Sequence, residues 1–403
     1  MPIAQGTLKR LSYKKQSGLA VAASGAGGQY LRRETATFNQ MKDTFNSNEI
    51  VTHQQYTGDT YGVSKVTGQL SGVISALTYS ALLASVVRKD FAAVAAASAI
   101  SLTIAGAGPY TLTRATGDFL TGGFKIGHVV RITAGTYTGT ARDINLLVTG
   151  VTATVLTVVV PNGSTLTVQG PIATSTVAVT GKTTIVPTTG HTVDYYTIED
   201  WFADLSRSRT YTDVQVGSAD ISCPATGNAT IGLAFMGLGR TKGGAQVLTS
   251  PTAETSTTIL SASNAYIMVN GVRTIVATGL SLKIDGQVAH GEAVIGSRVI
   301  TDLSRGDVKV SGSFTAVHDA ETTSDLFVNE TAVGIIAVLF ADNSATSEFV
   351  NFVIPRAKLL KDDIDDGKKQ LVSTFDFTAE INTTGGAALA SDQTILGMQD
   401  SAA

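Results

Sequence analysis

The sequence has little charge and a single cysteine. Charged residues make up only 15% of the 403 residues, where a soluble domain usually has about a quarter. Cys223 stands alone, which excludes an internal disulfide and any zinc site built from several cysteines. The net charge of −3 excludes an overall basic field that would draw the chain to nucleic acid or to anionic lipid. Such a chain either covers much of its surface in a larger assembly or has a neutral exterior rich in Ser and Thr.

Long hydrophobic runs are also missing. Four basic residues at 9, 10, 14 and 15 precede a short apolar stretch at 18–23, which is too short and too poor in leucine for a signal peptide. We therefore expect an exposed N-terminal arm. Residues 91–113 carry no charge, but their Ala, Ser, Thr and Gly contribute little to insertion, so no membrane insertion is expected. Whether 91–113 forms a strand or a helix stays open.

No motif of the sequence predicts catalysis or metal binding. None of the five histidines belongs to an HExxH pattern, and solvated positions are expected for them. The Gly181-Lys182-Thr183 run lacks the leading glycine of a phosphate loop at position 176. The aspartate-rich stretch 361–367 has Val372 where a calcium loop needs its last glutamate, so a charged surface turn is expected. We expect no enzyme, no cofactor and no metal.

The residues that are abundant favour strands. Hydrophobic residues reach 43%, glycine is frequent at 41 residues, and Thr, Val and Ser crowd the middle of the chain. This composition is typical of many short strands joined by tight turns. We therefore predict a mainly β fold with one or two short helices. The Thr- and Val-rich stretch 95–187 is predicted to be a small all-β domain inserted into a larger one.

An internal repeat appears when the sequence is shifted by 244 positions. The identical pairs include Gly62 with Gly306, Lys65 with Lys309, Val66 with Val310, Gly68 with Gly312, Thr78 with Thr322, Ser80 with Ser324 and Leu82 with Leu326. In both stretches apolar residues alternate with polar ones, which predicts strands at 66–74 and 308–316 with one buried face. A glycine on that face indicates that another group approaches the sheet closely. Short helices are expected next, with Thr78 and Thr322 as their N-caps.

These patterns divide the chain into three parts. Residues 1–94 are the first part of the core with the N-terminal arm, 95–187 the inserted domain, and 188–403 the second part of the core. The last part contains strands at 229–236 and 371–381, a polar flexible loop or arm at 239–263, and a tail of about twenty residues at the end.

Several short motifs, in order along the chain, resemble those of siphophage tail tube proteins. They are Tyr30-Leu31-Arg32-Arg33 through Ser47-Asn48-Glu49-Ile50, Val66 to Gly72, Tyr79 to Leu83, Tyr196 to Glu199, Phe235-Met236-Gly237, and Ile354 to Leu359 before the aspartate-rich turn. The stretch Gly117 to Val130 resembles an extra β domain of some members.

The resemblance implies a β-sandwich or barrel core with a helix at its side. Such subunits form six-membered rings that stack into a hollow tube in the virion tail, which conducts DNA during ejection. The implied partners are further copies of the chain, the tape measure protein and DNA in the lumen, and tail terminator and baseplate proteins at the ends. Synthesis in the host bacterial cytoplasm is implied as well. We expect a neutral or acidic lumen, because a basic wall would hold the DNA.

Arms and long loops connect the subunits of such a tube. The residues expected at contacts between subunits are Arg32, Arg33, Glu49, Lys242, Thr252 and Glu254, and the C-terminal tail is expected to take part. The inserted domain is expected on the exterior, because an inward insertion would block the channel.

Two alternatives stay open. The chain could be another virion structural protein, such as a decoration or tail-terminator subunit, or a β-rich carbohydrate-binding or adhesion module. Tubes in electron micrographs would separate the first from a tail tube, and a cluster of exposed aromatics would favour the second.

Overall fold

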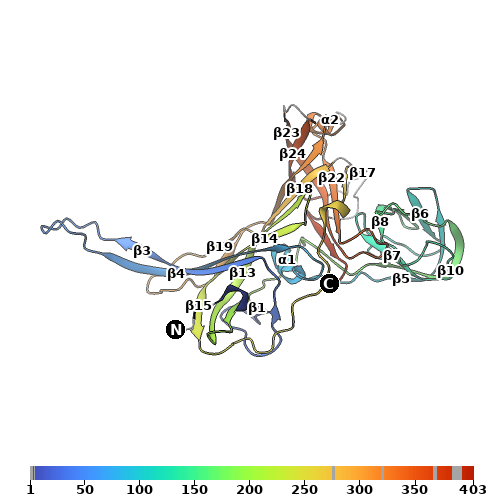
Figure 1. Ribbon diagram of the computed structural model, residues 1–403. Helices are drawn as coiled ribbons and strands as arrows, with labels where there is room; N and C mark the ends of the chain where they lie inside the picture. Colours follow the sequence, from blue (N-terminus) through green and yellow to red (C-terminus); the bar gives the residue numbers. More distant parts are fainter. Residues whose placement is uncertain (1–2, 4, 275–276, 319–321, 366–369, 384–392) are drawn as a thin grey trace.

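The computed structural model describes residues 3, 5–274, 277–318, 322–365, 370–383 and 393–403, and it is mainly β (Figure 1). The mainly β prediction with short helices is confirmed. The helices of the described residues are α1 (Ser80–Val87) and α2 (Thr322–Val328), with two 3-10 turns, η1 (Gly6–Leu8) and η2 (Ala262–Asn264).

A set of strands that we call the first copy surrounds α1. Its members are β1 (Lys9–Lys15), β2 (Gln29–Tyr30), β3 (Thr35–Asn46), β4 (Asp59–Val73), β12 (Tyr196–Phe202), β13 (Arg207–Pro224), β14 (Thr230–Gly237) and β15 (Gly239–Gly243). A corresponding set, the second copy, surrounds α2. Its members are β16 (Tyr266–Val269), β17 (Val272–Arg273), β18 (Ala277–Asp285), β21 (Lys309–Val317), β22 (Val333–Phe340), β23 (Phe349–Ile364), β24 (Val372–Ala379) and β25 (Gly397–Asp400).

The two copies agree residue by residue in how their strands pair. Phe38 lies opposite Gly68 in the β3–β4 hairpin, and Leu282 opposite Gly312, each 244 residues further on, in the β18–β21 hairpin. The β13–β14 pair has a bulge between Val216 and Ser218, and the β23–β24 pair has one at the corresponding place. The predicted repeat is therefore present, and it extends from one strand and helix to the whole set of strands.

Each copy is a sandwich of two sheets that share one long, bent strand. The first half of β13 pairs with β12 and β15, and its second half with β14 and β18. The first half of β23 pairs with β22 and β25, and its second half with β24. Because β13 pairs with β18 of the other copy, a continuous sheet runs through both copies in the order β3-β4-β14-β13-β18-β21-β24-β23.

The buried face of this sheet forms the main hydrophobic core together with α1. Its glycines leave room for aromatic rings, as the repeat predicted. The Phe38 ring covers Gly68, and a Cβ at Gly312 would lie 2.7 Å from the ring of Phe377. An alanine at Gly68 would displace the Phe38 ring, and an alanine at Gly312 would clash with the backbone carbonyl of Ser281 as well as with the Phe377 ring.

A closed barrel follows α1 in the chain. Its strands are β5 (Ala97–Ala105), β6 (Tyr110–Arg114), β7 (Val129–Ala134), β8 (Leu146–Val151), β9 (Val155–Val159) and β10 (Gln169–Val179). It has a hydrophobic core of its own. Residues 91–113, left open above, contribute the strands β5 and β6. Apolar side chains including Ile126, Val129, Val338 and Phe349 join the barrel to the second copy.

Three short strands lie outside both copies and the barrel. After the barrel, β11 (Lys182–Ile185) pairs with β25. The strands β19 (Val288–His290) and β20 (Leu303–Arg305) pair with each other in the connection between β18 and β21. In the first copy the equivalent of this connection is the tip of the β3–β4 hairpin, which reaches away from the body (Figure 1).

The expected N-terminal arm and C-terminal tail are strands of the fold, so these expectations were wrong. Leu11 in β1 is 2% exposed, because β1 pairs with β12 and β2. The strand β25 lies between β11 and β23, and Met398 is buried. Residues 384–392 of the expected tail lie outside the described residues.

The expected helix caps were also wrong. Tyr79 is the residue before α1, and Thr78 shares a hydrogen bond with the hydroxyl of Ser75 instead. The carboxylate of Asp400 from β25 lies beside the start of α1, where it accepts from the Leu77 amide at 2.8 Å and from the Ser80 hydroxyl. Burial raises the pKa of Asp400, although these hydrogen bonds favour its charged form. In the second copy, α2 begins at Thr322 itself.

The segment 239–263 is not a free loop. It begins as the strand β15, and the buried carboxylate of Glu199 accepts from the amides of Val247 and Leu248 at 2.7 and 2.8 Å. Leu248 and Leu260 are fully buried. Deleting this segment would therefore damage the fold. The expected turn at 361–367 begins within β23, and residues 366–369 lie outside the described residues.

Candidate assembly surfaces

The open face of the continuous sheet is polar and crosses both copies. One row of opposing residues runs over Thr35, Ser71, Gly232, Asp220, Lys283, Ser311 and Thr378. Small hydroxyl residues dominate this face and bond across strands, as Ser281 does with Ser313 at 2.9 Å. The face is thus a smooth, neutral wall.

Its charged residues are few and of both signs. The cations on the strands of this face include Lys65, Lys283, Lys309, Lys358 and Lys361, and the acids include Asp43, Asp220, Asp285, Asp363 and Asp376. Some pair with each other, such as Lys65 with Asp43 at 2.9 Å. The face therefore has no excess of positive charge to hold phosphates.

The joint between the two copies combines strand pairing with a covering connection. In the paired strands, Asp220 lies opposite Lys283, and Ile221 opposite Leu282. The connection 286–308 lies on the first copy, where Arg88 donates to the carbonyls of Gly286 and Gly306 at 2.8 and 2.7 Å. Burial, with a smaller contribution from nearby Arg305, lowers the pKa of Arg88.

Three further contacts hold this connection. Arg305 donates to the Gln215 side chain at 2.8 Å, and the Tyr195 hydroxyl donates to Asp302 at 2.8 Å. A ring nitrogen of His290 lies 3.2 and 3.1 Å from the carbonyl oxygens of Val66 and Gly237, at the pair of strands β4 and β14. The joint is therefore polar at its rim and on the open face of the paired strands, and apolar on their buried face.

The β3–β4 hairpin extends well past its neighbour strand. Because β14 pairs only with Val66–Val73 of β4, residues 42–64 extend past it, and we call them the hairpin arm. The base of the arm, at Val63 and Ser64, packs on the connection 286–308. The apolar side chains beyond this base are exposed, with Phe45 at 62%, Ile50 at 102% and Tyr61 at 71%. A soluble protein rarely exposes such a group of large apolar side chains without a partner.

A second exposed apolar group lies at the opposite end of the continuous sheet. Its members are spread along the second half of β23, the end of α2 and both ends of β24, and they are between 38% and 71% exposed: Val328, Leu360, Ile364, Leu371 and Ile381. We call it the far-edge patch. The hairpin arm and the far-edge patch are thus exposed at the two ends of one sheet.

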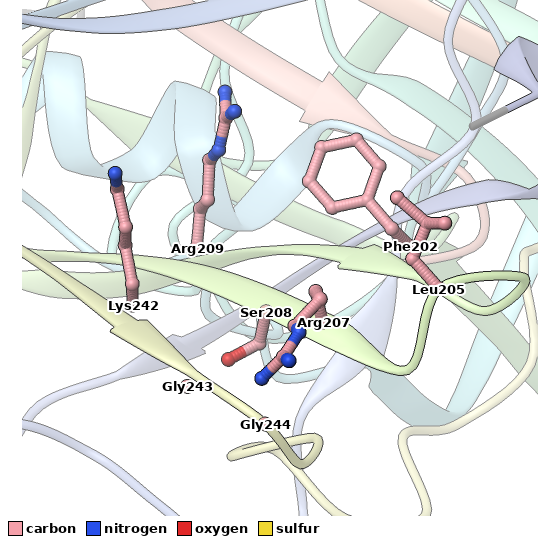
Figure 2. A pocket seen from close by; sticks show the side chains of 8 residues that line it. All are labelled: Phe202, Leu205, Arg207, Ser208, Arg209, Lys242, Gly243 and Gly244. Carbon is pink, nitrogen blue, oxygen red and sulfur yellow. The ribbon is translucent and has the colours of Figure 1, made fainter. Parts of the chain in front are cut away.

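Lys242, one of the expected contact residues, lines a pocket of about 450 Å³ with Arg207, Arg209 and Phe202. Arg209 and Lys242 rise side by side from neighbouring strands, and Arg207 points to the other side (Figure 2). The Arg209 guanidinium lies over the Phe202 ring at 5.4 Å. Burial raises the pKa of Asp200 on the adjoining strand, although Lys9 lies 2.9 Å from its carboxylate. The pocket is a basic patch on the first copy.

The two arginines expected at subunit contacts hold their own chain together. Arg32 donates to the Thr257 carbonyl at 2.8 Å and to the Ser75 hydroxyl at 3.2 Å. Arg33 donates to the Lys9 carbonyl at 2.6 Å. Both side chains are only partly exposed. Their role between subunits stays a prediction.

The other three expected contact residues lie apart from one another. Glu49 is exposed at the tip of the hairpin arm, and Glu254 is exposed on the connection between the copies. Thr252 forms a bridge with Gln29, and its amide donates to the Gly28 carbonyl at 2.8 Å. Sequence reasoning missed the apolar residues of the hairpin arm and the far-edge patch. The only signal was that Met41 and Phe45 fall on polar positions of the alternating pattern.

No group of three or more metal-ligating side chains occurs in the part of the chain that the structure describes. His128 differs from the expected solvated histidine, because burial and nearby Lys125 lower its pKa to about 3. None of the described helices is long and apolar enough to span a membrane.

The comparisons with known proteins identify a family. The family model described as phage tail tube protein matches residues 6–379. No curated protein matches the chain significantly.

Proposed function

Since the chain belongs to the phage tail tube protein family, a structural part of the virion tail that assembles into a tube, we propose that its tube consists of stacked six-membered rings and conducts DNA during ejection. The observation that carries the proposal is the continuous sheet, with one buried face and one open face of small hydroxyl residues. The tape measure protein would fill the lumen before ejection, and terminator and baseplate proteins would close the ends. Synthesis in the cytoplasm of the host bacterium belongs to the same proposal.

The open face is the surface best suited to line the lumen. Each lysine or arginine that contacts a phosphate releases counterions and so adds to the affinity for DNA. The aspartates on the strands of this face are at least as many as the lysines, and the remaining residues are mostly Ser, Thr and Gly. Such a wall would let DNA pass without holding it.

The six expected contact residues and the boundaries of the three parts, 1–94, 95–187 and 188–403, enter this proposal, without the arm, free loop and tail that the fold does not have. Lys242 lies in a basic patch that could receive an acidic surface of the adjacent ring. The barrel at 95–187 would be a separate domain on the outer side of the tube. This placement is supported by its attachment to β22 and β23, away from the open face of the continuous sheet.

Electron microscopy of the concentrated protein tests the tube, which should have a constant diameter. To test the lumen, Ser281→Lys and Ser313→Lys are introduced together into the phage. We expect intact tubes whose DNA release is slowed several-fold at low salt and recovers at high salt. The matched control places the two lysines at Ser164 and Thr165, which are exposed on the barrel. Equal release from both variants, or a cryo-EM tube with a continuous basic inner wall, would contradict the proposed lumen.

A further inference from the structure

The two ends of the continuous sheet have unpaired edges. Among the described residues, β3 pairs with β4 alone, and beyond Ala357 the second half of β23 pairs with β24 alone. Unpaired edges offer free backbone donors and acceptors to another strand, so folded proteins usually cover them. Two β3 carbonyl oxygens, of Ala36 and Phe38, accept from Lys9 and Tyr211. A carbonyl oxygen has two lone pairs, so these contacts leave room for a strand partner.

Inside the chain, the equivalents of these two edges pair with each other. The second half of β13 corresponds to the second half of β23, and β18 corresponds to β3. The joint between the copies is the pairing of β13 with β18. The chain therefore contains one complete joint, together with the two unmatched halves of a second one.

The exposed apolar residues lie where this second joint would bury them. Ile364 is 49% exposed, and its equivalent Ile221, which lies inside the joint, is 2% exposed. The hairpin arm occupies the position of the connection 286–308, which covers the first copy. A partner that repeats the joint would cover both exposed groups at once.

We propose that β3 of one chain pairs antiparallel with the second half of β23 of a second copy of this chain, in the register of the joint inside the chain. Asn39 then lies opposite Asp363, as Lys283 lies opposite Asp220. Met41 lies opposite Lys361, and Thr37 opposite Asp365. The hairpin arm extends over the second copy of the neighbouring chain, as the connection 286–308 extends over the first copy within the chain.

This pairing determines how many chains form a ring. The inference rests on the proposed function and sharpens it, because we take the six members of the proposed ring to be six copies of the strand set, two from each chain. If the joints within and between chains are equivalent, the two copies of each chain fill two adjacent positions of the ring. Head-to-tail contacts of this kind can close into a ring. Three chains then complete it. Each chain has one barrel, so a ring has three barrels on its outer side.

Cross-linking by paired cysteines tests the register. Asn39 and Asp363 are both exposed, so Asn39→Cys with Asp363→Cys leaves the core unchanged. Opposing residues of antiparallel strands have Cβ atoms about 4.5–5.5 Å apart, close to the range of a disulfide. The native Cys223 is 4% exposed and stays in every variant, and the chain without substitutions controls for it.

Oxidation of the assembled double variant should give covalent species of two and three chains that reductant reverses. The matched control, Asn39→Cys with Asp362→Cys, puts the second thiol on the opposite face and should give at most a tenth of the product. Species of up to six chains would overturn the count of three. Tubes in the micrographs without cross-linking, or equal cross-linking of both variants, would overturn the register while the proposed function stands. Absence of tubes in the unsubstituted protein would instead overturn the proposed function.

Image averages of single rings test the count independently. Three outer protrusions per ring support the three-chain ring. Six protrusions would overturn it.

Discussion

Ile221 and Ile364 occupy equivalent positions in the two copies, and their exposures are 2% and 49%. Both belong to the long bent strand of their copy. Ile221 lies opposite Ile231 in β14, and Ile364 lies opposite Ser373, the equivalent position in β24. The difference comes from the outer side of the strand, where Ile221 also has Leu282 opposite it in β18. An isoleucine kept at an exposed edge position is consistent with burial in the assembly.

Substituting Ile364 with Asp should prevent assembly and leave the chain folded. Changes at exposed positions usually alter stability by less than about 0.5 kcal/mol, whereas a charge placed in a new joint has no partner there. Thermal unfolding and electron microscopy of the same sample measure the two effects. Ile221→Asp is the contrasting variant and should lower the free energy of unfolding by more than about 3 kcal/mol. Normal tubes from Ile364→Asp would contradict burial of this edge.

Shortening the hairpin arm should have the same selective effect. Residues 47–58 are replaced by Asn-Gly, a two-residue turn that suits a hairpin with Asn46 opposite Asp59. The removed tip includes Ile50 and Tyr56, both exposed, so the melting temperature should stay within about 2 °C. Rings should fail to close or should fall apart on dilution, as sedimentation would show. A variant with Ile50→Ser and Tyr56→Ser, which keeps the length, should show a weaker defect.

The sequence predicted those strands whose two faces differ strongly. The alternation at 66–74 and 308–316 indicated β4 and β21, and the runs at 229–236 and 371–381 indicated β14 and β24. In each case the buried residues are apolar and their neighbours polar, so the period of two is visible without structural information.

Strands that are buried by distant parts of the chain could not be recognised in this way. The strand β1 reads as a basic segment, because Leu11 and Tyr13 are its only apolar residues. The strand β25 contains Gln399 and Asp400, whose burial depends on the barrel and on α1. The side-chain amide of Gln399 accepts from the Val129 amide and donates to the Val129 carbonyl, both at 2.8 Å. Such burial depends on contacts across more than 200 residues, which no local pattern contains.

The candidate surfaces were harder still to predict. The shift of 244 residues indicated the repeat, but the equivalence of β13 with β23 involves a shift of 143, because the barrel lies between α1 and β12. The equivalence of β13 with β23 is visible only in the registers of strand pairing. The contact residues chosen from charge and loop position therefore missed the apolar edge, where the strongest evidence for assembly lies.

Removing the barrel should leave a core that still forms open tubes. The chain can be rejoined at Ala92 and Thr183, whose amides and carbonyls bond to each other at 2.8 and 2.9 Å. A short glycine-containing turn in place of 94–181 closes this bridge. The excision uncovers Ile336 and Val338, so Ile336→Thr and Val338→Thr are added to maintain solubility. We expect tubes of smaller outer diameter and unchanged inner diameter. Blocked or absent tubes from a folded variant would contradict an outer position of the barrel.

Acid should destabilise the chain partly through His128, which precedes β7 where the barrel meets the second copy. Its pKa is about 3 in the folded chain, against 6.5 in a free histidine, because burial and Lys125 disfavour its charged form. Between pH 6.5 and pH 3 the unfolded chain therefore binds a proton at His128 that the folded chain does not bind. The stabilisation is complete above pH 6.5 and is lost as the pH falls toward 3. One proton changes the free energy of unfolding by at most about 1.4 kcal/mol per pH unit, and the partial exposure of His128 reduces this slope.

Urea unfolding from pH 7 to pH 4 should show a smaller loss of stability for His128→Gln than for the unsubstituted chain. His191→Gln, at an exposed position, is the matched control substitution. Equal pH dependence of the His128 variant and the unsubstituted chain would show that another group causes the loss.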